Sequence, residues 1–101
     1  EGRLREAEAL FIHSLEVLLK NRPNNEFEIA RITNNLAVLY QLQGRLEEAE
    51  AYFKRTIDIQ LRILPPGHLE FARNYANLAQ VFRGLGRLRE AVRYAESDKY
   101  V

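Results

Sequence analysis

Cysteine, methionine and tryptophan are absent from this sequence of 101 residues, and histidine occurs only twice. The absence of cysteine excludes disulfide bonds and thiol catalysis, and with only two histidines it argues against a zinc site. No apolar run approaches the ~18 residues that a membrane-spanning helix needs, and the N-terminus lacks a signal-peptide pattern. We therefore expect no membrane partner, no cofactor or metal, and a cytoplasmic location.

Neither sign of charge dominates the sequence. Fifteen Lys and Arg residues stand against fourteen Asp and Glu residues, for a net charge of +1, and the balance is even along the chain. A nucleic-acid-binding protein concentrates positive charge to displace counterions from the phosphates. The sequence therefore predicts no nucleic-acid partner.

The main feature of the sequence is a repeat with a period of 42 residues. GRLREAEA at 2–9 returns as GRLEEAEA at 44–51 and begins again as GRLREAV at 86–92. An ungapped alignment of 2–43 with 44–85 gives sixteen identical positions. A repeat of this length is typical of a solenoid, in which each unit buries its apolar face against its neighbours. We therefore interpret the chain as a single array over 1–101, made of units 2–43 and 44–85 and a partial third unit at 86–101.

Within each unit the apolar residues recur every three or four positions, which is the spacing of an amphipathic helix. One such stripe consists of Leu46, Ala49, Phe53, Ile57, Leu61 and Leu64. Gly44 and Gly86 can adopt the left-handed conformation that closes a helix, and Pro23 and Pro65 interrupt helical hydrogen bonding. The sequence therefore predicts an all-α fold, a right-handed superhelix of five antiparallel helices at 3–22, 26–43, 45–64, 68–85 and 87–98.

Glutamates cluster in the first turns of the helices that follow the repeated glycines. They are Glu6 and Glu8 in the first unit and Glu47, Glu48 and Glu50 in the second. Negative charge at a helix N-terminus interacts favourably with the helix dipole. We interpret these glutamates as capping and solubilising residues.

No catalytic constellation is apparent. His13 and His68 occupy different positions in the repeat, and no repeated Ser, His and Asp set accompanies either one. His68 follows Pro66-Gly67 at a predicted helix start, where helix capping is the expected role. Because a nucleophile, a base and a residue to orient them cannot be assembled, we expect that the protein is not an enzyme.

The repeat resembles the tetratricopeptide repeat family. The family's spaced signature corresponds to Leu36, Ala37, Tyr40, Gly44, Leu46, Ala49, Phe53 and Thr56, and again to Leu78, Ala79, Phe82, Gly86, Leu88 and Ala91. The unit is longer than usual and is similar to the variant found in kinesin light chains and in many bacterial repeat proteins. The resemblance implies a solenoid of helical hairpins that acts as a scaffold for protein–protein interaction.

Both ends of the chain depart from the family pattern. Residues 2–22 match a second helix without its first helix, so we expect a fragment of an array that opens in the middle of a repeat. In the last unit Ala95 stands where Phe11 and Phe53 stand in the others. The final helix is therefore either a polar cap or a truncated one.

The resemblance also implies that the concave groove, lined mainly by the first helix of each hairpin, recognises a peptide. With Leu36, Ala37 and Tyr40 inward, helical spacing assigns a groove-facing stripe to each first helix. The candidate peptide-binding residues are Arg31, Asn34, Asn35, Val38, Gln41, Arg73, Asn77, Gln80 and Arg83. In peptide-binding members of the family, an asparagine at the position of Asn35 and Asn77 hydrogen-bonds the ligand backbone. Arg31 and Arg73 can clamp a carboxylate, so the expected ligand is an extended, acidic peptide.

Other interpretations of these residues remain open. Asn35 and Asn77 can instead bridge neighbouring hairpins, and the arginines can be ordinary solvated charges. The alternative function is structural: a self-association in which array ends stack into homo-oligomers. The observation behind this alternative is the apolar face of the first helix, which consists of Phe11, Ile12, Leu15, Val17, Leu18 and Leu19. The helix that should cover this face is missing, and an apolar face of this size rarely stays exposed on a soluble monomer.

Overall fold

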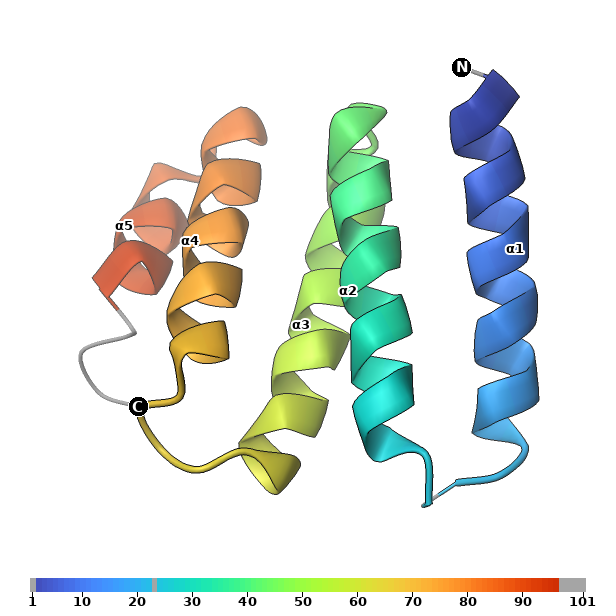
Figure 1. The fold of residues 1–101 in the computed structure, drawn as a ribbon. Helices are drawn as coiled ribbons and strands as arrows, with labels where there is room; N and C mark the ends of the chain where they lie inside the picture. The colour runs from blue at the N-terminus through green and yellow to red at the C-terminus, as the bar shows by residue number, and fades with distance from the viewer. Residues whose placement is uncertain (1, 23, 97–101) are drawn as a thin grey trace.

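A computed structural model describes residues 2–22 and 24–96 of the chain. It contains five helices: α1 (Gly2–Leu19), α2 (Glu26–Leu42), α3 (Leu46–Ile63), α4 (Leu69–Gly84) and α5 (Leu88–Glu96). Successive helices run antiparallel and stand side by side in chain order (Figure 1). The described residues form no β-strand. The predicted all-α fold of five helices is confirmed.

The helices form a flat stack with principal dimensions of 35 × 34 × 16 Å. The main interhelix contacts join neighbours in the sequence, α1 with α2, α2 with α3, α3 with α4, and α4 with α5. This is the arrangement that a 42-residue repeat of two helices requires, because each helix must bury its apolar face against the next.

The repeated glycines end the first helix of each hairpin. Gly44 and Gly86 have φ values of 76° and 79°, in the left-handed region that residues with a Cβ atom avoid. The N–H of Gly44 donates to the carbonyl of Gln41, and that of Gly86 donates to the carbonyl of Arg83, both at 3.0 Å. The helix breaks predicted at these glycines are confirmed.

The connection between α3 and α4 contains the second predicted break. α3 ends at Ile63 and α4 begins at Leu69, with Pro65-Pro66-Gly67 between them. The Nδ1 atom of His68 accepts a hydrogen bond of 3.1 Å from the N–H of Glu70. His68 therefore caps α4, as the sequence predicted.

The predicted bounds were wrong at the end of the first helix, which stops at Leu19 and not at residue 22. The N–H groups of Lys20 and Asn21 donate to the carbonyls three residues earlier, at 3.3 and 3.0 Å, so the chain tightens into a turn. A proline at position 23 has no N–H to donate to the Leu19 carbonyl and its ring clashes with that carbonyl in an α-helix, which accounts for an end at Leu19. The other helices start and end within one residue of their predicted bounds, and residues 97 and 98 lie outside the described residues.

The core is formed by most of the residues in the predicted stripes, but Leu61 is 52% exposed and the neighbouring Gln60 is buried in its place. Its fully or nearly fully buried apolar side chains include Ile29, Leu36, Ala37, Ala49, Phe53, Phe71, Leu78, Val81 and Phe82. Ala37 and Ala49, on the facing sides of α2 and α3, have no exposed surface. Because an alanine side chain is small, it allows the two helix backbones to approach closely.

Among the described residues, no helix combines the length and the apolar character that crossing a bilayer requires.

Candidate functional site

The nine candidate residues lie on α2 and α4, on the sides of these helices that face away from the core. Leu36, Ala37 and Tyr40 are buried, which agrees with the predicted inward face. The exposed candidates are Arg31, Val38, Arg73, Gln80 and Arg83, and the half-buried ones are Asn34, Asn35, Gln41 and Asn77.

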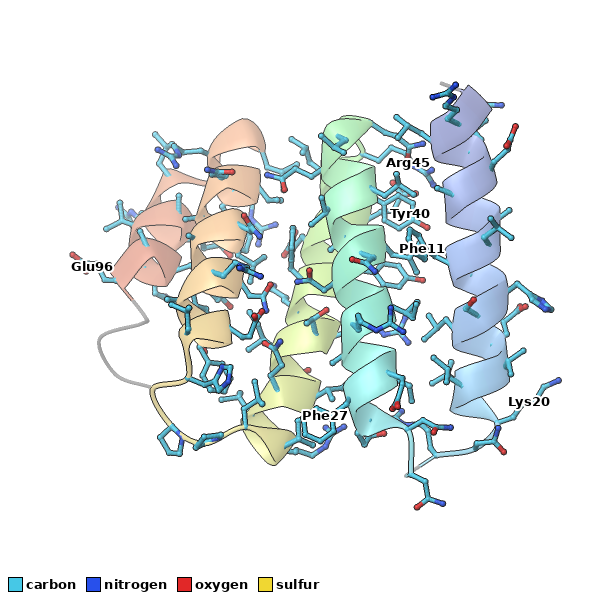
Figure 2. The ribbon with its side chains drawn as sticks, viewed as in Figure 1. Phe11, Lys20, Phe27, Tyr40, Arg45 and Glu96 are labelled. Carbon is cyan, nitrogen blue, oxygen red and sulfur yellow. The ribbon has the colours of Figure 1, made fainter. Side chains whose placement is uncertain are left out.

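Four of the nine residues come together around one hollow of about 330 Å³, here called the α2–α4 groove. The groove opens between α2, the C-terminal end of α3 and the first turns of α4. Its lining is Phe27, Ala30, Arg31, Asn34, Asn35, Gln60, Ile63, Leu64, Glu70 and Arg73. Phe27 is 64% exposed and lies beside the C-terminal end of α3 (Figure 2). The groove therefore has a cationic and amide part from α2 and α4 and an apolar part from Phe27 and α3.

The other candidates lie outside this lining. The Gln41 amide donates a hydrogen bond of 3.3 Å to the side-chain oxygen of Gln80, which links α2 to α4. Arg83 lines a separate hollow of about 330 Å³ against α5, with Leu88 and Val92. The predicted stripe therefore does not form one surface. Four residues line the α2–α4 groove, Gln41 and Gln80 bond to each other, and Arg83 lies at the α5 end of the stack. Val38 and Asn77 line neither hollow.

The two arginines of the α2–α4 groove differ in how they are engaged. Arg31 has no ion pair or side-chain hydrogen bond with any described residue, whereas Arg73 contacts the Glu70 carboxylate at 3.4 Å. The half-buried Asn35 amide likewise has no side-chain hydrogen bond within residues 2–22 and 24–96. A free guanidinium and a free amide are therefore available to a ligand on one face of α2.

The half-buried Asn34 amide is engaged by two buried residues that the sequence did not single out. It donates to the side-chain oxygen of Asn74, and the Asn74 amide donates to the Gln60 oxygen at 2.8 Å. Asn74 is fully buried and Gln60 is 7% exposed. These three side chains, here called the polar triad, connect α2, α3 and α4. A signal was present, because one repeat earlier Leu18 and Ile32 stand where Gln60 and Asn74 stand.

A second missed feature is an arginine that follows each helix-closing glycine. Arg45 bonds to the carboxylates of Glu8 at 2.9 Å and Glu48 at 2.6 Å, and its guanidinium lies 4.4 Å from the centre of the Tyr40 ring. Figure 2 shows Arg45 and Tyr40 between α1 and α2, above Phe11. Arg45 thus joins α3 to α1, which are the second helices of two successive hairpins.

The same arrangement recurs one unit later. Arg87 bonds to Glu50 at 2.7 Å and to Glu90 at 2.6 Å, and its guanidinium lies 4.5 Å from the centre of the Phe82 ring. We call Arg45 and Arg87, with their glutamates and rings, the arginine ladder. Glu47 and Glu48 lie in the first turn of α3, as predicted. Glu6, Glu8 and Glu50 lie outside the first turns of their helices, so their interpretation as first-turn residues was wrong. Glu8 and Glu50 instead accept from the ladder arginines.

The ladder changes the ionisation of its members. Burial, with the hydrogen bond to Glu8 as the next cause, raises the pKa of the Tyr40 hydroxyl to about 12. Burial pushes the pKa of the Glu50 carboxyl upward, but the hydrogen bonds from Lys54 and Arg87 outweigh it, and the pKa lies below its usual value. A lowered pKa favours the charged carboxylate of Glu50, which is the form that pairs with Arg87.

A second hollow, of about 340 Å³, lies between α1 and α2 and is here called the α1–α2 groove. It is lined by His13, Ser14, Val17, Leu18, Glu28, Arg31 and Ile32. The prediction that the six apolar residues of the first helix lack a partner was wrong for five of them, since Leu15 is buried and Phe11, Ile12, Leu18 and Leu19 are half-buried against the core. Leu10 and Val17 are 68% and 45% exposed. One unit later the corresponding residues, Tyr52 and Ile59, are covered by α2, and the Tyr52 ring lies 5.4 Å from that of Tyr40. This face of α1 has no covering helix among the described residues.

Comparison with known families identifies the pattern as a whole. The family model of the tetratricopeptide repeat matches residues 28–97, which span most of α2 and all of α3, α4 and α5. Repeats of this kind are typically non-catalytic modules of protein–protein interaction. No curated protein matches the chain.

Proposed function

The chain belongs to the tetratricopeptide repeat family, whose repeats are protein-interaction modules, and from this premise we propose that its α2–α4 groove holds an extended, acidic segment of a partner protein. The 42-residue period favours the extended repeat variant similar to that of kinesin light chains. The central contacts use Arg31 and Asn35, whose side chains have no polar partner among the described residues.

The guanidinium of Arg31 carries the proposal, because it faces the groove without an ion pair to any described residue. A ligand carboxylate between Arg31 and Arg73 gains charge-assisted hydrogen bonds from both. Glu70 weakens the second of these by holding Arg73 at 3.4 Å. We therefore expect Arg31 to contribute more to affinity than Arg73.

The remaining lining indicates what lies beside the carboxylate. The Asn35 amide can donate to a backbone carbonyl and accept from a backbone N–H, which suits an extended chain of any sequence. Phe27, Ile63 and Leu64 offer apolar surface a few residues along the ligand. The proposed ligand is thus an extended segment with an acidic residue close to an apolar one. We expect micromolar affinity, since the interface is small and the ligand loses conformational freedom on binding.

The test is an array of short peptides that carry Asp or Glu, each printed beside the same peptide with Asn or Gln. We expect the acidic member of a pair to bind more tightly, and Arg31→Gln to weaken that binding by about tenfold through the lost charge-assisted bonds. Arg83→Gln is the matched control, because it removes the same charge from the separate hollow at α5. If Arg31→Gln binds as well as Arg83→Gln, the α2–α4 groove is not the site.

A second candidate function is self-association, and the observation that favours it is the exposed apolar face of α1. Leu10 and Val17 line this face beside the open α1–α2 groove. Contiguous apolar surface of this kind marks interaction sites on soluble proteins. Sedimentation or light scattering should show a mass that rises with concentration above that of the 11.8 kDa chain. A mass equal to one chain up to millimolar concentration would exclude self-association.

A further inference from the structure

We propose that the chain assembles head to tail by helix exchange, in which α1 of one copy takes the place of α5 on α4 of the next. This proposal rests on self-association and specifies its surface, its occupant and its polarity. It follows from the repeat, because α1 and α5 are the same element two units apart. Residue n of the incoming α1 takes the position of residue n + 84, so that Arg3 takes the position of Arg87.

Helix α5 lacks the side chains by which α1 holds the helices that follow it. On α1, Glu8 accepts from the Tyr40 hydroxyl at 3.1 Å and from Arg45 at 2.9 Å, and Phe11 packs against the core. These contacts hold α1 to the hairpin formed by α2 and α3. At the corresponding positions α5 carries Val92, which can accept no hydrogen bond, and Ala95. A further hairpin therefore cannot stack on α5 as α2 stacks on α1. It must be preceded by a helix that carries the contacts of α1, and α1 of the next copy is such a helix.

The arginine ladder continues in the sequence with Arg3, which corresponds to Arg45 and Arg87. Arg45 forms an ion pair with Glu8 of α1, and Arg87 forms the equivalent ion pair with Glu50 of α3. Arg3 is the third arginine in this series, and it has no partner among the described residues. In the exchanged arrangement Arg3 of the incoming copy meets Glu50 and the Phe82 ring, which Arg87 engages in the single chain.

The existing interface and the proposed exchanged interface each join side chains of one kind, polar in the first and apolar in the second. In the existing interface, the polar triad places Asn34 of α2 against Gln60 and Asn74. In the exchanged interface, α4 takes the role of α2 and presents the exposed Ala76 where α2 presents Asn34. Facing it are Leu18 and Ile32 of the incoming copy, in place of Gln60 and Asn74. All three positions change from polar to apolar together, as an interface between these two surfaces requires.

The exchange also covers the surface that the single chain leaves open. Leu69, at the start of α4, is 73% exposed and takes the role that Phe27 has on α2. The 16-residue α4 would pack along the exposed side of the 18-residue α1, where Leu10 and Val17 lie. In the single chain α4 is faced by α5, which the structure describes over Leu88–Glu96. Because the contact joins two different surfaces, it leaves a free end on every assembly and produces open chains.

The experiment uses the full chain and a charge swap across the proposed contact. Arg3→Glu places a carboxylate opposite Glu50, and we expect it to raise the concentration needed for assembly by about tenfold or more. Mixing it with Glu50→Arg should restore assembly, because the pair is then rebuilt with opposite signs. Arg5→Glu is the matched control, since it makes the same charge change at an exposed position of α1 outside the ladder. Circular dichroism establishes that each variant is folded.

Open-ended growth of the parent, loss with Arg3→Glu and recovery in the mixture would together support the exchange. Assembly that stops at two copies, or that responds equally to Arg3→Glu and Arg5→Glu, would overturn the exchange while leaving self-association in place. A parent chain that stays monomeric would overturn both. None of these outcomes bears on peptide binding, because the α2–α4 groove is formed within one copy.

Discussion

Replacing Asn74 by isoleucine, the residue found one repeat earlier, should destabilise the chain although it makes the two units more alike. Asn74 is fully buried and holds both other members of the polar triad. Without it the Gln60 side-chain oxygen, on a residue that is 7% exposed, loses its donor. An unsatisfied buried polar group costs about 1–3 kcal/mol. For a domain of this size a loss of ~2 kcal/mol lowers the melting temperature by roughly 8–16 °C.

The matched control replaces the whole triad, with Asn34→Ala, Gln60→Leu and Asn74→Ile together. This variant carries the apolar set formed by Ala76, Leu18 and Ile32 of the proposed exchanged interface. Replacing both partners of a buried hydrogen bond by apolar groups of similar shape is nearly neutral, so its stability should return to within about 1 kcal/mol of the parent. Thermal and urea unfolding, followed by circular dichroism at one low protein concentration, measure both variants. A single variant as stable as the parent, or a triple variant no better than the single one, would refute the reasoning.

Three further perturbations probe other parts of the structure. Ala49→Leu should cost about 1–3 kcal/mol in urea unfolding, because Ala49 has no exposed surface between α2 and α3, and an unchanged midpoint would contradict that close packing. Asn35→Ala should weaken peptide binding in fluorescence polarisation while leaving helicity intact, and Asn77→Ala is the control because Asn77 lies outside the groove lining; equal binding by the two variants would show that the Asn35 amide does not hold the ligand. The pKa of Glu26 is lowered from 4.5 to about 2, first by the hydrogen bond from Arg22 and then by that from Arg62. A depressed carboxyl pKa stabilises the fold above the unfolded value, and this contribution is lost as pH falls from about 4.5 to 2. Glu26→Gln should therefore melt at a temperature that depends less on pH in that window, and an unchanged slope would show that this carboxylate is not linked to folding.

The periodicity predicted the helices and their buried faces because both depend on neighbours along one helix. Gly44 and Gly86 were predicted as helix ends for the same reason, since a left-handed residue is a local requirement. The end of α1 at Leu19 shows the limit of this reasoning, because the effect of Pro23 extends further back than the break itself.

The contacts between helices were harder to predict. Asn34 was assigned to the groove from its helical position, but its amide is held by Asn74, 40 residues away. The pairing depends on how closely α2 and α4 approach and on which rotamers meet, and neither follows from spacing. The ladder glutamates were misinterpreted in the same way, because a glutamate in a first turn suits the helix dipole whether or not an arginine of the next unit reaches it.

The stacking order also has a consequence for local unfolding. Each helix contacts mainly its neighbours in the sequence, so opening one end of the stack removes a single layer of contacts. Amide hydrogen exchange should therefore form a gradient, with the slowest exchange in α2 and α3, where the Thr33 and Thr56 hydroxyls share a buried hydrogen bond of 2.7 Å. Exchange should be fastest in α5, whose main contact is with α4. Release of α5 then requires a local opening and not global unfolding, so the rest of the stack can remain folded while its last helix is replaced.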